Sequence, residues 1–241
     1  MPVTRYEKRG GISTWWFPKD FSQSRYGEYC RSGRNSCTLI SLILANEISY
    51  QAEFCRRADQ LPPRAVDIFS GAINDGNAVY HRLEGQVEML MRDSRNLNIP
   101  DALDALKQHH HKKVTFQLKE LFFTHLQADP TKRSAELPVP ALTTRYLFVL
   151  MIADSRTTTL VFEVPNNVVA FIDSHNHGHN TGACITQASI RNLNSLSFWF
   201  VSMLDQIYTS KPELYEISFF STQEVEDALE TSSICLPPTI S

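Results

Sequence analysis

The sequence predicts an α+β fold in which a helical part packs on an antiparallel β-meander. Residues 51–130 carry mainly helical patterns, whereas the following part of the chain holds apolar runs separated by short turns. Neither internal repeats nor a clear linker is visible, so residues 1–220 are interpreted as one domain. Residues 221–241 are polar and contain proline, and they are expected to form a C-terminal tail.

The composition narrows the class of protein. The chain has 241 residues, of which 42% are hydrophobic and 20% charged, as is typical of a soluble globular protein. A net charge of −3 gives no electrostatic reason to expect a nucleic-acid partner. The longest apolar run, Tyr146–Ala153, is too short to span a bilayer, and the N-terminus lacks an apolar signal core. A cytoplasmic location is therefore expected, or the host cytosol if the chain is a viral or bacterial effector.

The cysteines indicate free thiols. Five cysteines occur at irregular spacing, and none forms a Cys-x-x-Cys pair. This pattern suggests neither a disulfide framework nor a cysteine-rich zinc site. A reducing compartment is the default interpretation, and no cofactor is indicated.

One cysteine stands at the start of a buried helix. Residues 1–35 are rich in aromatic and turn residues and are expected to form an extended lead-in with little helix. Ser36 resembles an N-cap. Almost no polar face is left by the apolar residues Leu39, Ile40, Leu42, Ile43 and Leu44, which predicts a buried helix. Cys37 would lie in its first turn, where unpaired backbone N–H groups and the helix dipole favour a thiolate. The alternative is that Cys37 is a small core residue.

The remaining elements follow from local patterns. Asn98 to Asp101 opens a short helix that ends near Lys107. Residues 119–127 fit a helix or a strand equally well. The other helices are expected at 64–74, 79–91 and 189–208, strands at 113–117, 145–153, 157–164, 168–172 and 182–185, and a loop at 129–140.

A second motif complements the cysteine. The strand at 168–172 is followed by Asp173 and His175, and alternate residues of a strand point the same way. The carboxylate can then accept the imidazole N–H, fix its tautomer and leave the other ring nitrogen for a thiol proton. Joined to Cys37, these groups are the parts of a cysteine nucleophile. A plain turn is the alternative interpretation of the same residues.

Two further sets of side chains are candidates. Gln23, 14 residues before Cys37, is the first choice for an oxyanion donor, and Asn35 is the second. A solvent-exposed glutamine is the alternative. His175, His177 and His179 alternate along the chain and could bind zinc or copper, although Asp173 is the one further ligand nearby. No metal is assigned.

These motifs resemble a known family. A glutamine upstream of a cysteine that opens a buried helix, followed by a meander and then Phe-Ile-Asp-Ser-His, is similar to the herpesvirus large-tegument-protein deubiquitinases and their relatives. That family belongs to the papain-like cysteine peptidases and takes its carboxylate from an Asp-x-His on one strand. The resemblance covers roughly residues 10–205. It implies a papain-like fold, Cys37 as nucleophile, His175 as base, Asp173 as orienting carboxylate and Gln23 as oxyanion donor.

The resulting hypothesis is a thiol-dependent isopeptidase acting on ubiquitin or a ubiquitin-like protein. A tail ending in Gly-Gly suits a narrow cleft, which Trp15, Trp16 or Tyr26 could line if they are not simply core residues. Three alternatives stay open. They are an inactive papain-like scaffold that binds a protein partner, a papain-like protease or acyltransferase with another substrate, and the histidine metal site.

Overall fold

The computed structural model describes residues 2, 4–90, 96–109, 126–127, 145–210, 212 and 214–221. The predicted strand at 113–117, the loop at 129–140 and all but the first residue of the tail at 221–241 lie outside these residues. Within them, no helix is long and apolar enough to cross a membrane.

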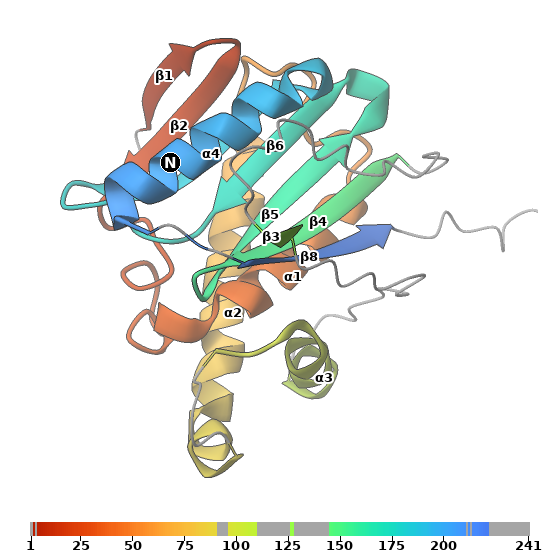
Figure 1. Ribbon diagram of the computed structural model, residues 1–241. Helices are drawn as coiled ribbons and strands as arrows, with labels where there is room; N and C mark the ends of the chain where they lie inside the picture. Colours follow the sequence, from red (N-terminus) through yellow and green to blue (C-terminus); the bar gives the residue numbers. More distant parts are fainter. Residues whose placement is uncertain are drawn as a thin grey trace, which may run out of the picture.

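An eight-stranded sheet forms the centre of the described structure (Figure 1). Its order is β1-β2-β7-β6-β5-β4-β8-β3, and every neighbouring pair is antiparallel. The strands are β1 Arg5–Arg9, β2 Ile12–Pro18, β3 Leu126–Gln127, β4 Tyr146–Ala153, β5 Arg156–Glu163, β6 Val168–Asp173, β7 Thr181–Ser189 and β8 Leu214–Ser221.

The predicted meander is confirmed, but the sheet is larger than the sequence indicated. Strands β4, β5 and β6 pair in succession, and β7 extends the predicted fourth strand. The lead-in is extended as expected, yet it forms the hairpin β1–β2, which joins the sheet through β7. Strand β1 is exposed along its whole length and β2 is buried at all but its last position, so neither alternates in the way that identifies a strand.

The helices also differ from prediction in one respect. The two helices expected at 64–74 and 79–91 are one continuous helix, because Gly76 does not end it. Helix α2 approaches α1 so closely that a Cβ at Gly76 would lie 3.1 Å from the backbone nitrogen of Ile40. The described helices are α1 Cys37–Ser49, α2 Pro63–Leu90, α3 Ile99–His109 and α4 Leu193–Tyr208, with short 3₁₀ turns at Ser32–Asn35, Val164–Asn166 and Ile190–Asn192.

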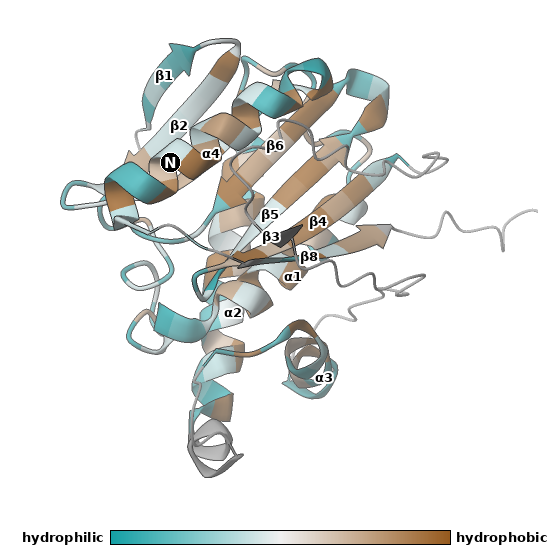
Figure 2. Cartoon of the chain, in the orientation of Figure 1, coloured by the Kyte–Doolittle hydropathy of each residue, from teal (hydrophilic) through white to brown (hydrophobic). Residues whose placement is uncertain are grey.

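Two cores lie on opposite faces of the sheet. Tyr146, Phe148 and Leu150 of β4 pack toward α1, α2 and α3, whereas Leu147 and Val149 pack toward α4. This alternation follows from the two-residue period of a strand. Helix α4 therefore covers one face, and the other three helices cover the other (Figure 1). Apolar residues are concentrated in the strands of the meander, whereas β1 is hydrophilic (Figure 2).

A buried carboxylate ties the segment after α1 to the sheet. The side chain of Glu163, which is 1% exposed, accepts hydrogen bonds from the backbone nitrogens of Cys55 at 2.7 Å and Phe54 at 3.3 Å. The Tyr146 hydroxyl at 3.3 Å and the Asn166 amide at 3.0 Å donate to the same side chain. One buried residue thus satisfies four donors from three parts of the chain.

Removing this acceptor is expected to destabilise the fold. Replacement of Glu163 by Ala removes the acceptor of the backbone N–H groups of Phe54 and Cys55, whereas Tyr146 and Asn166 keep other acceptors. The free energy of unfolding should fall by about 3 kcal/mol. Denaturation in guanidinium chloride measures the change, and Glu28→Ala, at an exposed position, is the matched control. A Glu163→Ala protein as stable as the control would show that water or rearrangement replaces these bonds.

Candidate active site

The two motifs predicted to meet do meet. Cys37 is the first residue of α1, and Asp173 is the last residue of β6, with His175 two residues beyond it. The Cys37 thiol and the His175 ring lie close enough to shift each other's pKa, and Nδ1 of His175 lies 2.6 Å from Asp173 Oδ1. We refer to Cys37, His175 and Asp173 as the candidate triad. Its three members come from α1 and from the end of β6.

The contact between carboxylate and imidazole is made by a turn rather than by strand alternation. Strand β6 ends at Asp173, so His175 lies beyond the sheet. Oδ1 of Asp173 accepts both the backbone N–H of His175 at 2.9 Å and its ring Nδ1–H. The turn and the carboxylate–imidazole contact therefore occur together, because the turn itself brings the ring to the carboxylate. Nε2 of His175 is left for the thiol.

The electrostatics favour a thiolate–imidazolium pair. Burial raises the pKa of the Cys37 thiol, but hydrogen bonding and charge interaction with His175 outweigh it, so the pKa falls below its usual value. Burial opposes the charge of His175, but Asp173 and Cys37 raise its pKa to about 9. Burial would also raise the pKa of Asp173, yet His175 and His177 hold it below its usual range. The arrangement can therefore supply a nucleophilic sulfur and an adjacent proton donor.

Thr157 is a partner of the thiol that the sequence did not reveal. Its backbone N–H and its hydroxyl both lower the pKa of Cys37 by hydrogen bonding. The Thr157 and Thr38 hydroxyls lie 2.9 Å apart, and Thr38 donates to the carbonyl of Leu97 at 2.9 Å. Because β5 begins beside the N-terminus of α1, the sheet supplies donors to a helix residue. No local sequence signal marks Thr157, since the contact depends on this long-range packing.

Gln23 lies between the two halves of the candidate site. Its side-chain Oε1 accepts from the Ser174 hydroxyl at 2.7 Å, and its Nε2 donates to the carbonyl of Arg34 at 3.0 Å. Its backbone N–H also donates to the Ser174 carbonyl at 2.8 Å. Gln23 is buried, so the alternative of an exposed glutamine is wrong. Its amide joins the residue between Asp173 and His175 to the turn that precedes Cys37.

A buried asparagine of α2 hydrogen-bonds both Gln23 and the residue before Cys37. Asn77 donates through Nδ2 to the Gln23 carbonyl at 2.8 Å, and its Oδ1 accepts from the Ser36 hydroxyl at 2.7 Å. Ser36 occupies the N-cap position of α1, but its side chain makes no cap hydrogen bond. Its hydroxyl lies between Asn77 Oδ1 and the carbonyl oxygen of Gly33, which is 2.9 Å away. The sequence predicts a break between two helices at Asn77, so it gives no indication that this residue supports the candidate site. Asn35, the second choice as oxyanion donor, is partly buried beside these residues.

The Cys37 thiol is buried and does not lie in a groove open to solvent. Cys37 is 2% exposed, and the side chain of His175 is 13% exposed. The aromatic residues considered as cleft walls are largely interior. Trp15 and Trp16 are buried in β2, and the Tyr26 ring packs 4.7 Å from the ring of Phe21.

The histidine metal site is not supported by the described residues. Among them no group of three or more His, Cys, Asp or Glu side chains is placed to hold a metal ion. His177 is buried, with Nδ1 2.8 Å from the Gly182 carbonyl and Nε2 3.1 Å from Asp173 Oδ2. His179, by contrast, is exposed. Both ring nitrogens of His177 are therefore already engaged by the protein.

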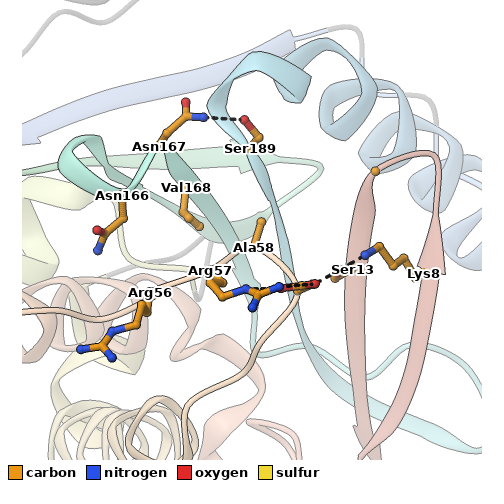
Figure 3. Close-up of a pocket in the computed structure, with 11 residues that line it drawn as sticks. Lys8, Ser13, Arg56, Arg57, Ala58, Asn166, Asn167, Val168 and Ser189 are labelled. Carbon is orange, nitrogen blue, oxygen red and sulfur yellow. Dashed lines mark hydrogen bonds and ion pairs between the residues drawn. The ribbon is translucent and has the colours of Figure 1, made fainter.

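A basic hollow of about 370 Å³ lies at the opposite end of β6 from the candidate triad (Figure 3). Each of its three cations is paired with a carboxylate. Lys8 lies 3.7 Å from Asp59, Arg57 lies 3.1 Å from the same side chain, and Arg56 lies 3.1 Å from Glu53. Three cations thus share two carboxylates, so most of the positive charge of the hollow is already paired within the protein.

Comparison with known proteins yields one distant similarity to report. No protein-family model matches the chain, and no curated protein matches it. It is similar to the crystal structure of the ubiquitin-specific protease encoded by murine cytomegalovirus tegument protein M48, in complex with a ubiquitin-based suicide substrate. The TM-score is 0.47 and the identity 10%, over 87% of this chain and 88% of that chain. The described fold is a mixed helix and antiparallel-sheet architecture, and its papain-like assignment stays a prediction.

Proposed function

We propose that this protein is a thiol-dependent isopeptidase that cleaves after the C-terminal glycine of ubiquitin or a ubiquitin-like protein. The observation that carries the chemical part is the juxtaposition of the Cys37 thiol with the His175 ring, whose Nδ1 is hydrogen-bonded to Asp173. The substrate part is supported by the resemblance of Gln23, Cys37 and residues 171–175 to the tegument deubiquitinases. Residues 1–220 would form the single papain-like catalytic domain.

The reaction would proceed by acyl transfer. The Cys37 thiolate attacks the carbonyl carbon of the terminal glycine, and the charge develops on the carbonyl oxygen near the amide of Gln23 and the N-terminus of α1. His175 donates its proton to the leaving lysine amine, and the C–N bond breaks to leave a thioester. His175 then accepts a proton from water, which attacks the thioester and releases the glycine carboxylate and the thiolate.

Ubiquitin carrying a C-terminal electrophile tests this proposal directly. The folded protein should gain the mass of one ubiquitin, and peptide mapping should place the bond on Cys37. Cys30 is an internal control, because it is more exposed than Cys37 but is not part of the candidate triad. A Cys30→Ser protein should react at the wild-type rate. Absence of an adduct in folded protein, or an adduct on Cys30, would contradict the proposal.

The dependence on pH should differ between alkylation and hydrolysis. Above the lowered pKa of Cys37 the sulfur is a thiolate, and below about pH 9 His175 keeps its proton. Alkylation by the electrophile needs only the thiolate, so its rate should rise with pH and then level off. Hydrolysis of an isopeptide also needs a proton for the amine, so its rate should fall above about pH 9. Parallel rate measurements on both substrates check this, and identical profiles would argue against His175 as the acid.

One observation favours a second candidate, an inactive papain-like scaffold that binds a protein partner. Cys37 is 2% exposed, so a substrate carbonyl reaches the sulfur only if neighbouring side chains move. The electrophile experiment separates the two candidates. A scaffold would bind ubiquitin without forming a covalent bond, whereas an isopeptidase would form one.

A further inference from the structure

A second imidazole contacts the carboxylate of the candidate triad. Nε2 of His177 lies 3.1 Å from Oδ2 of Asp173, whereas the His175 ring lies on Oδ1. Asp173 and His177 are both buried, on the sheet face covered by α4. The two oxygens of one carboxylate are thus divided between two histidines, and the thiol reaction described above uses only His175.

The contacts of His177 define the protonation of its ring. Nδ1 lies 2.8 Å from the carbonyl oxygen of Gly182, which can only accept a hydrogen bond. Nε2 faces Asp173, whose pKa is held low by His175 and His177 in spite of burial, so this carboxylate also accepts. A neutral imidazole has one N–H, but here both nitrogens must donate. His177 is therefore an imidazolium.

Three further groups surround the His177 ring. Cys184 Sγ of β7 lies 3.7 Å from Nε2, and burial raises the pKa of this thiol while the charge of His177 lowers it. Tyr208 of α4 packs its ring 5.7 Å from the imidazole, with Arg156 lying over the tyrosine ring. Trp16 of β2 completes the enclosure, edge-on at 5.3 Å.

We propose that His177 is a buried, constantly protonated positioning residue that clamps Asp173 and shares the carboxylate charge with His175. Its role in turnover rests on the proposed function, but its charge and its hold on Asp173 do not. The clamp fixes Oδ2, so that Oδ1 is presented to the His175 ring. The positive charge of His177 also opposes protonation of His175, which keeps His175 able to release its proton.

The charge state can be measured on the wild-type protein without any substrate. Nitrogen-15 NMR of the imidazoles at pH 7 should show both ring nitrogens of His177 protonated, with no titration across the range in which the fold is stable. A neutral His177 ring at pH 7 would overturn the proposal. Failure of the ubiquitin electrophile to react would refute the isopeptidase function and leave this result intact.

Three variants separate the charge of His177 from its hydrogen bonds. His177→Gln can keep a neutral donor to Asp173, and His177→Asn can keep one to the Gly182 carbonyl. His179→Gln is the control, because it removes an exposed histidine of the same loop. In His177→Gln the NMR titration midpoint of His175 should rise by about one pH unit, because a like charge is lost. In His177→Asn the rate of adduct formation should also fall about tenfold to a hundredfold, because Asp173 loses its clamp.

Each outcome of these variants bears on the proposal. His179→Gln should match wild type in both the midpoint and the rate. An unchanged His175 midpoint in His177→Gln would contradict the charge-sharing role. A His177→Asn protein that reacts as fast as His177→Gln would contradict the clamp.

Discussion

Replacement of Asp173 by Asn is expected to lower kcat for isopeptide hydrolysis by roughly 10³- to 10⁴-fold. The carboxylate is the main group that raises the pKa of His175 to about 9 against burial. Without its charge the imidazolium is no longer favoured, and the thiolate of Cys37 loses its counter-ion. Steady-state kinetics on a ubiquitin–peptide isopeptide would measure the loss, which should appear in kcat rather than in KM.

The same substitution should also disturb His177. An asparagine that keeps its oxygen toward His175 turns its NH₂ toward Nε2 of His177, which already carries a proton. His177 must then lose that proton or the amide must rotate, and rotation presents a donor to the Nδ1–H of His175. Asp104→Asn, on the exposed side of α3, is the matched control and should leave kcat unchanged. A small loss in Asp173→Asn would mean that the imidazole is oriented by other contacts.

The local sequence pattern was sufficient to predict the elements that are defined by their own residues. The runs that became β4, β5 and β6 are apolar or β-branched and end at turns, so their pairing as a meander followed from order alone. Helix α3 begins where predicted, because Asn98 accepts from the backbone of Asp101 at 2.8 Å. Cys37 likewise begins α1 as expected, since five large apolar residues between positions 39 and 44 follow the small polar Ser36 and predict a buried helix.

The local sequence pattern was insufficient to predict elements that depend on partners distant in the sequence. Strand β1 is exposed throughout and is held by its ladder with β2, so its sequence carries no burial signal. Helix α2 continues through Asn74 to Asn77 because Gly76 fits against α1, although the same residues predict a break. The contacts of the polar site residues are even harder to predict from sequence, since their partners come from other elements. His177 was visible as part of an alternating histidine run, but only the fold turns it toward Asp173 rather than toward a metal.

Replacement of Gln23 by Ala has the second-largest expected effect, a fall in kcat of about 10²- to 10³-fold. One N–H of its amide is used by the Arg34 carbonyl at 3.0 Å, which fixes the amide and leaves the second N–H as the candidate donor to a substrate oxyanion. Ser174 fixes the other end of the amide at 2.7 Å. Because both anchors hold the group before substrate arrives, its donor requires little reorganisation in the transition state.

A loss of stability must be separated from this loss of rate. Gln23→Ala leaves the Ser174 hydroxyl and the Arg34 carbonyl unpaired in a buried region, which should lower the free energy of unfolding by about 1–3 kcal/mol. Asn77→Ala is the informative comparison, because Asn77 holds the Gln23 backbone without reaching the substrate itself. It should destabilise the fold to a similar degree and lower kcat much less. If the two variants lose equal amounts of activity when both are fully folded, Gln23 acts only as a structural link between the turn before Cys37 and the end of β6.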